Sequence, residues 1–453
     1  MTLSDAAVAA LGRTGADPET LGLLVRDQHR RQLLVVRAVL DATGDRLLDA
    51  WDLLTRADRA ASARAASGPE HAVTPDTPVR ARLLHPLTGS WAWHTLRDPG
   101  RPQALGHLAA IAAACAVRAG LDFTLRITAY DGMLVLPSLG ALRTEGDAEV
   151  TYRDGRVTIR QSGELDVTVH PEPDVGAWSA SGAWLPAHAL SGLVPGAPLV
   201  PLEDLDPYRT ARSPRSRAGL GEAVVLDDAG RKRWAQVWSG TGEALRTGGE
   251  HRVREALTLL RCLVPLTAPP HISAVHGTSS ATRREAFGAL LSSIPPGPVS
   301  FASTLVHELH HAKLSALSEM VTLHQASDEE RYFAPWRQDP RPFEGLLQGA
   351  YSHLAIADYQ QRLALTDPAH REPAWTEHAR CHAMVGAALP VLVGSPDLTV
   401  RGRLFVDAMA DAHERMRDHP APRGQRARAQ AYVRAARTLW TQRHASARGR
   451  PNE

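Results

Sequence analysis

Cysteine is scarce in this chain, with only three residues among 453. Cys115, Cys262 and Cys381 are far apart in the sequence, and none belongs to a CxxC pair. An odd number of widely spaced cysteines predicts neither a disulfide framework nor a thiolate metal site. This cysteine usage is typical of a protein in a reducing cytoplasm.

The chain also lacks a large excess of positive or negative charge, and it lacks long apolar runs. The 51 Lys and Arg residues nearly balance the 49 Asp and Glu residues, which gives no strong field to attract nucleic acid or an anionic membrane. The longest apolar run, near 387–394, contains Pro390 and is far shorter than the ~20 residues that cross a bilayer. The N-terminus has neither the basic start nor the apolar core of a secretory signal. We therefore expect a cytoplasmic protein with no nucleic-acid partner and no membrane partner.

The spacing of apolar residues changes along the chain. Residues 1–66 place apolar side chains three and four positions apart, as on amphipathic helices. From 123 to about 170, polar and apolar residues alternate around two Asp-Gly pairs, at 131–132 and 154–155, which are strong hairpin signals. The helical spacing then returns for most of the remaining chain. The pattern predicts an α+β, predominantly helical fold with an antiparallel β-meander of four or more strands.

Changes of spacing and composition also set the boundaries of five predicted regions. They are an N-terminal helical region at 1–120, an antiparallel β-rich region at 121–215, a helical connector at 216–292, a second large helical region at 293–440 and a polar tail at 441–453.

An HExxH motif, His307-Glu308-Leu309-His310-His311, lies in the second large helical region. On a helix, His307 and His311 lie one turn along and ~40° apart, so both imidazoles can bind one divalent cation. Glu308 is rotated by ~100° from His307, where it can approach the open side of the metal or hold a water. The motif predicts that 293–440 is a metal-binding catalytic region with Glu308 as a catalytic residue. The alternative is a chance match on a helix that binds no metal.

A catalytic metal site also needs a third protein ligand and open positions for water or substrate. His353 lies in a second apolar helical stretch, which can pack against the first and bring another imidazole to the metal. His310 is expected behind the ligands or at the surface, and Lys313 in solvent or in helix packing away from the metal. The alternative third ligands are His324, Glu344 and Asp358.

Five segments carry a likeness to a known family: LLHPLTGSWAW, HLAAIAAACAVRAGLDF, DGMLVLPSLG, FASTLVHELHHAKLSAL and APWRQDPRPFEGLLQGAYSHLAIADY. They resemble the HExxH-type peptide β-hydroxylases of ribosomal peptide (RiPP) biosynthesis clusters, over roughly residues 80–410. In that family the motif is associated with Fe(II) and 2-oxoglutarate rather than with zinc. Related domains occur beside or fused to radical enzymes that mature ribosomal peptides.

The resemblance implies an iron ion held by the three histidines, with positions left for 2-oxoglutarate and O2. The distal carboxylate of 2-oxoglutarate needs a cation, and a guanidinium binds a carboxylate through two parallel hydrogen bonds. Arg337 and Arg341 are the candidates, because they lie in a Pro-containing loop directly before the His353 helix. The alternative for each arginine is an ion pair with Asp339 or a hydrogen bond to a backbone carbonyl.

A three-histidine set departs from the two-histidine, one-carboxylate triad of ordinary non-haem iron oxygenases. This departure leaves the role of Glu308 open. It either orients water, O2 or a ligand, or braces one of the histidines.

Three functions compete on these grounds. The first is Fe(II)/2-oxoglutarate-dependent β-hydroxylation of a side chain in a ribosomally synthesised precursor peptide. The second is a zinc metallopeptidase, in which Glu308 deprotonates a water on Zn(II). The third is a non-enzymatic peptide-binding protein with a vestigial metal helix. The residues alone favour the peptidase, whereas the resemblance favours the hydroxylase.

The expected partners are the precursor peptide and other peptide-maturation enzymes. An exposed strand edge within 123–170 could pair with the peptide by β-augmentation. The alternative is that the meander only supports the catalytic helices.

Overall fold

The computed structural model describes residues 3–66, 76–210, 220–268 and 279–448. The chain divides into two compact units. Unit 1 comprises 1–27, 237–260 and 295–453, and unit 2 comprises 28–236 and 261–294. The predicted α+β, predominantly helical fold is confirmed. Each unit gathers separate stretches of sequence, whereas the five predicted regions simply follow one another along the chain.

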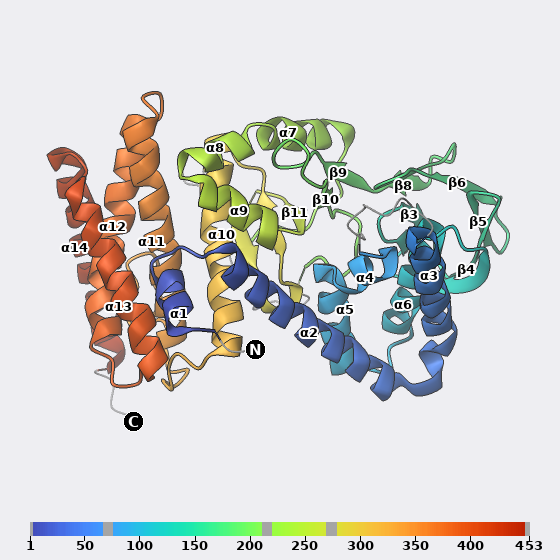
Figure 1. Ribbon diagram of the computed structural model, residues 1–453, viewed down its shortest axis with the longest axis horizontal. Coiled ribbons are helices and arrows are strands. Elements are labelled where there is room, and N and C mark those ends of the chain that lie inside the picture. The colour runs from blue at the N-terminus through green and yellow to red at the C-terminus, as the bar shows by residue number, and fades with distance from the viewer. Residues whose placement is uncertain (1–2, 67–75, 211–219, 269–278, 449–453) are drawn as a thin grey trace. The chain divides into compact units, whose positions relative to one another are not determined.

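The described part of unit 1 is made of helices. The central pair is α10 (Pro298–Met320) and α11 (Phe343–Thr366), which pack against each other, and α12 (Arg371–Val393) packs along α11. Figure 1 shows α11 to α14 side by side in one bundle. The other elements of this unit are α1 (Asp5–Gly12), the start of α2 (Pro18–Thr43), α8 (Thr241–Thr247), α9 (Glu250–Leu259), α13 (Val400–Arg415), the 3-10 turn Met416–Asp418 and α14 (Arg423–Arg448).

Local sequence signals set the ends of these helices. Pro298 lies in the first turn of α10, where its missing N–H costs no helical hydrogen bond. Thr399 caps α13, because its side chain accepts a hydrogen bond from the Gly402 N–H at 3.0 Å. The helices then bury long apolar stripes, which in α10 include Leu305 and Leu309.

The predicted β-meander is confirmed in unit 2. The strands β4 (Asp147–Arg153), β5 (Arg156–Gln161) and β6 (Val167–Pro171) follow one another antiparallel, and β1 (Phe123–Thr128) pairs with the free side of β4. Asp154 and Gly155 have positive φ angles, as the two-residue turn between β4 and β5 requires. With β7 (Ala177–Trp178), these strands form a sheet in the order β1-β4-β5-β6-β7.

Two further sheets lie in the described part of unit 2. One joins β2 (Met133–Leu136), β3 (Gly140–Arg143) and β8 (Trp184–Pro186). The other has the order β12-β13-β11-β10-β9, in which β11 runs parallel to both β10 and β13. The strands of this sheet are β9 (His188–Leu190), β10 (Val200–Leu202), β11 (Cys262–Leu266), β12 (Ser280–Thr282) and β13 (Ala289–Ser293).

The prediction of a helical connector at 216–292 is wrong in part, because this region also contains the strands β11, β12 and β13. Every residue of β11 and β13 is buried, so neither strand shows the polar and apolar alternation that identifies a half-exposed strand. The helices of that region are α7 (Asp228–Trp238), α8 and α9.

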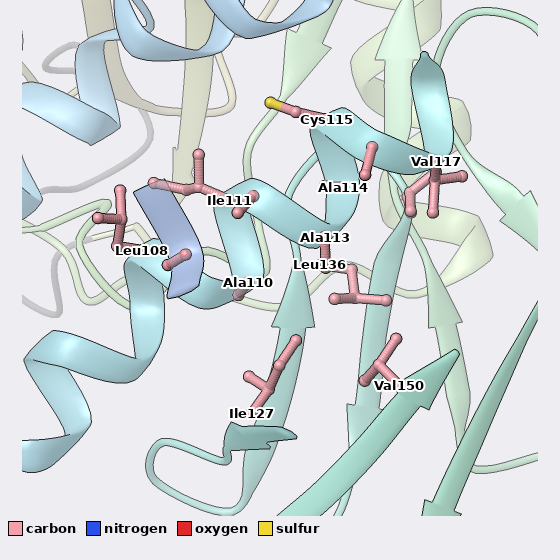
Figure 2. Close-up of a cluster of buried hydrophobic side chains, with 14 of the residues drawn as sticks. Leu108, Ala110, Ile111, Ala113, Ala114, Cys115, Val117, Ile127, Leu136 and Val150 are labelled. Atoms are coloured by element: carbon pink, nitrogen blue, oxygen red, sulfur yellow. The ribbon is translucent and has the colours of Figure 1, made fainter. Parts of the chain in front are cut away.

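The main core of unit 2 lies between α6 (Pro102–Arg118) and the strands (Figure 2). Leu108 and Ile111 of α6 and Ile127, Leu136 and Val150 of the strands are almost completely buried. Burial of each such side chain contributes roughly 1.5–3 kcal/mol. The remaining elements of the unit are the rest of α2, the 3-10 turns Gly44–Leu47 and Arg284–Ala286, α3 (Leu48–Ala66), α4 (Pro78–Leu83) and α5 (Pro86–Arg97).

None of the helices in the described ranges is long and apolar enough to span a membrane. The predicted polar tail at 441–453 is helical as far as residue 448, because α14 continues through that residue. The rest of that predicted tail, 449–453, lies outside the described residues.

Candidate metal centre

The HExxH motif lies in the middle of α10, as predicted. His307 and His311 come from successive turns of one helix face, and the Nε2 atoms of the two rings are 3.1 Å apart. Two nitrogens that bind one cation at about 2.1 Å are roughly 3.0–3.4 Å apart for ligand angles of 90° to 110°. The spacing of this pair therefore fits two ligands of a single metal ion.

His353 reaches the same place from α11. Its ring lies edge-to-face with that of His307, with the ring centroids 5.3 Å apart, and the centroids of His307 and His311 are 4.7 Å apart. Imidazoles that share one cation at these ligand angles have centroids roughly 4.6–5.3 Å apart. His353 Nδ1 donates a hydrogen bond to the Gly349 carbonyl at 2.7 Å, which leaves Nε2 unprotonated in the neutral ring.

Gln348 fixes the tautomer of His311. The Gln348 amide nitrogen donates to the Glu344 carboxylate at 3.0 Å, and a carboxylate only accepts hydrogen bonds. Gln348 Oε1 therefore faces His311 Nδ1, at 3.1 Å, and makes that nitrogen the protonated one. His311 Nε2 is left bare and directed at His307. A hydrogen bond that orients an imidazole by its far nitrogen is the usual arrangement behind a metal ligand.

Two of the imidazoles, His307 and His353, are held in the neutral form that binds metals. Burial, together with the neighbouring His311 and His353, lowers the pKa of His307 well below that of an ordinary imidazole. Burial also lowers the pKa of His353 to about 4. His307 Nδ1 is buried without a hydrogen-bond partner among the described residues.

These observations test whether the residues fit a metal ion. Over the described ranges, no three His, Cys, Asp or Glu side chains form a ready-made metal-binding group. His307 and His311 nevertheless have the spacing of two ligands, and His353 contacts His307 with its own Nε2 unprotonated. The donor set fits a divalent metal with imidazole ligands. The assignment of His353 as the third ligand stays a prediction.

Trp336 covers one face of His353. The two rings are stacked, with centroids 4.8 Å apart and planes 19° apart. The indole also packs over Gly349, where any side chain on α11 would overlap it. Trp336 thus restricts His353 to one orientation.

The two candidate arginines both bind Asp339. Arg337 Nε donates to one carboxylate oxygen at 3.0 Å, and Arg341 Nη1 to the other at 3.3 Å. Arg337 is half-exposed, and Arg341 lies over Gly345 of α11 with its Nε atom buried and without a partner within the described residues. Each arginine therefore forms the ion pair with Asp339 that was expected as the alternative to binding 2-oxoglutarate. Binding of 2-oxoglutarate by either arginine stays a prediction.

Glu308 is buried, directly after His307 on α10. Its catalytic role stays a prediction. The alternative third ligands have other contacts: His324 Nε2 lies 2.9 Å from Glu344 Oε2, and Asp358 binds Arg252 at 2.8 Å.

His310 and Lys313 of α10 lie in a buried cluster with Arg252 and Glu255 of α9. His310 is completely buried and lies 3.0 Å from Arg252 of α9, so it is not at the surface. The Lys313 Nζ atom is also completely buried and binds Glu255 of α9 at 2.6 Å. Burial alone would raise the pKa of Glu255, but Lys313 and Arg252 hold it far below its usual range. Lys313 therefore packs between helices, as one of its two predicted positions had it. The other predicted position, in solvent, is wrong.

Gln348 and Trp336 were not identified as parts of the site from the sequence, and the buried ion pair of Glu255 with Lys313 was not predicted either. A glutamine in an otherwise apolar stretch before His353 was the only signal for Gln348. Glu255 lies 58 residues from Lys313, and no local pattern joins two such distant positions.

A scan against protein-family models and a search of curated proteins find no match for this chain.

Proposed function

We propose that this chain is an Fe(II)/2-oxoglutarate-dependent hydroxylase of a side-chain β-carbon in a ribosomally made precursor peptide. The observation that carries the proposal is the contact of His307 with two further imidazoles, one from its own helix and one from α11. A centre with three neutral ligands keeps positions open for a bidentate co-substrate and O2. The family resemblance selects iron and 2-oxoglutarate for those positions.

Iron, 2-oxoglutarate and O2 supply the oxidation in this chemistry, which turns a C–H bond into C–OH and 2-oxoglutarate into succinate and CO2. The protein's own contribution is to bind and orient. Gln348 keeps His311 Nε2 directed inward, and Trp336 holds His353 in place and shields it from water. Arg337 or Arg341 would bind the distal carboxylate of 2-oxoglutarate in exchange for Asp339. Glu308 would orient a water or a bound ligand.

A zinc metallopeptidase is the second candidate, because Glu308 directly follows the first histidine of an HExxH motif on a helix. In that reaction Glu308 would take a proton from the attacking water. Both candidates use the same three histidines, so loss of the metal abolishes either activity.

The test is to purify the chain without oxygen, load it with Fe(II) or Zn(II), and add a precursor peptide encoded near its gene. The hydroxylase predicts that one oxygen atom is added to the peptide and one succinate is formed, only with Fe(II), 2-oxoglutarate and O2. Cleavage of the peptide with Zn(II) and without 2-oxoglutarate would establish the peptidase instead.

Two variants test whether the enzymatic activity depends on the metal centre. His307→Ala should lose metal binding and turnover, whereas His419→Ala, a change of the same type at an exposed position, should keep both. Equal activity of the wild type and His307→Ala would contradict both metal-dependent functions.

A further inference from the structure

The last helix, α14, is strongly basic. It carries seven arginines and no Asp or Glu, in a chain whose formal net charge is only +2. Within the described residues, none of the six arginines from 423 to 443 forms an ion pair with a carboxylate. Arginines that stabilised the helix by local ion pairs would have acidic residues three or four positions away. This helix therefore has uncompensated positive charge.

A groove runs between α14 and the loop at 335–338. Its volume is about 730 Å³, which is the size of a pocket for several side chains rather than for a single small anion. The α14 side is apolar, with Tyr432 46% and Leu439 66% exposed, and Ala435 and Ala436 lie between them. Such exposure of large apolar side chains in one groove is typical of a binding surface.

Two guanidiniums also line this groove. Arg443 Nη1 donates to Gln338 Oε1 at 2.8 Å, a neutral partner that leaves the positive charge uncompensated. Arg337 Nε binds Asp339 at 3.0 Å, on the same loop. Arg337 is thus neutralised by Asp339, and Arg443 is the uncompensated cation of the groove, which makes the groove complementary to an acidic ligand.

Trp336 connects the groove to the metal centre. The same indole that lines the groove is stacked on His353. A ligand in the groove would therefore lie next to the residue that holds the third imidazole in place.

We infer that this groove binds an acidic peptide segment, with a carboxylate at Arg443 and an apolar side chain on Leu439 and Tyr432. The identification of that segment as part of the substrate rests on the proposed function. The binding itself does not, because it requires neither iron nor 2-oxoglutarate.

The test measures fluorescence anisotropy of a labelled 12-residue peptide of alternating Glu and Leu residues with the full-length, metal-free protein. A peptide with Lys in place of each Glu is the control for charge. The inference predicts saturable binding of the acidic peptide, no measurable binding of the basic one, and weaker binding as the salt concentration rises.

Two charge reversals on α14 locate the site. Arg443→Glu replaces an attraction by a repulsion in the groove and should weaken binding about tenfold. Arg434→Glu makes the same change on the opposite side of the helix, about 200° around its axis from Tyr432, and should change binding less than about twofold. Leu439→Ser should weaken binding without changing charge. Circular dichroism checks that each variant is folded.

Several outcomes would overturn the inference. These are equal effects of Arg443→Glu and Arg434→Glu, tighter binding of a single-stranded oligonucleotide of the same charge, or a dimer that Leu439→Ser dissociates, which would make a second copy the occupant. If only the proposed function is wrong, the result is different: the wild type does not hydroxylate the precursor peptide but still binds the acidic peptide.

Discussion

A single amide decides which nitrogen of His311 faces His307. Gln348 bonds His311 Nδ1 at 3.1 Å while Glu344 holds the other end of the amide at 3.0 Å. Gln348→Ala should weaken metal binding about 10- to 100-fold, because the ring loses the contact that fixes its tautomer and orientation. Competition with a chromophoric chelator measures this affinity.

Gln360→Ala is the matched control for that substitution. Gln360 lies on the same helix and bonds Ser303 of α10 at 3.2 Å, so it links the same two helices away from the histidines. Its removal should leave metal affinity unchanged. Equal losses in the two variants would mean that Gln348 acts only through helix packing.

At the scale of residues, the sequence predicts the groups that a motif or a helical repeat identifies. The spacing of His307 and His311 follows from helix geometry alone, and the structure has the two rings at ligand distance. Trp336 could not be assigned to the site, because its contact with His353 depends on how the loop at 335–338 folds back over α11.

Within α11, two glycines one turn apart have different surroundings. A Cβ atom at Gly349 would overlap the rigid Trp336 ring, whereas at Gly345 it would meet the flexible guanidinium of Arg341 at 3.0 Å. Gly349→Ala should displace Trp336 and weaken metal binding by His353. Gly345→Ala should keep metal affinity and stabilise the helix by about 0.5–1 kcal/mol. Chelator competition and thermal unfolding check the pair, and loss of metal affinity in Gly345→Ala would contradict this account.

The helices α9 and α10 are joined by buried charges. Glu255→Gln leaves Lys313 and Arg252 buried without their shared carboxylate and should lower the free energy of unfolding by about 3–5 kcal/mol. Glu250→Gln on the same helix removes only a surface ion pair with Arg246 and should cost less than about 1 kcal/mol. Urea unfolding followed by circular dichroism compares the two, and similar midpoints would show that the buried cluster contributes little.

At the scale of elements, prediction succeeded where a regular spacing marks one buried face. This holds for α10, α11 and the β1-β4-β5-β6 strands. It failed for β11 and β13, because a strand buried on both faces has the same continuous apolar run as a buried helix segment.

Partly buried histidines in both units make stability depend on pH. Burial lowers the pKa of His29, His188 and His251 to about 4 and that of His382 to about 3, from an ordinary value of 6.5. Below pH 6.5 the unfolded chain therefore binds more protons than the folded chain, and stability falls as the pH decreases toward about 4. These side chains keep partial contact with solvent, so screening makes the total loss smaller than the full pKa shifts would give.

Thermal unfolding of the metal-free protein at several pH values between about 7 and 4.5 measures this dependence. The unfolding temperature should fall steadily below pH 6.5. His251→Gln should reduce the slope, and His419→Gln, at an exposed position, should keep it. A constant unfolding temperature across this range would contradict the prediction.

The division of the whole chain into units could not be predicted from sequence order. Unit 1 combines the N-terminal residues and 237–260 with the C-terminal helices, so α9 joins α10 across a long insertion. Composition changes along a chain identify only contiguous regions. The charge of the whole molecule was equally uninformative, because the net value of +2 conceals the basic α14.

The central claim is that imidazoles from α10 and α11 hold one metal ion together. Anomalous diffraction at the iron edge, from crystals grown with Fe(II) without oxygen, tests it most directly. The account predicts one iron peak about 2 Å from Nε2 of His307, His311 and His353. A peak bound by His307 and His311 with His353 turned away, or iron at another place, would contradict it.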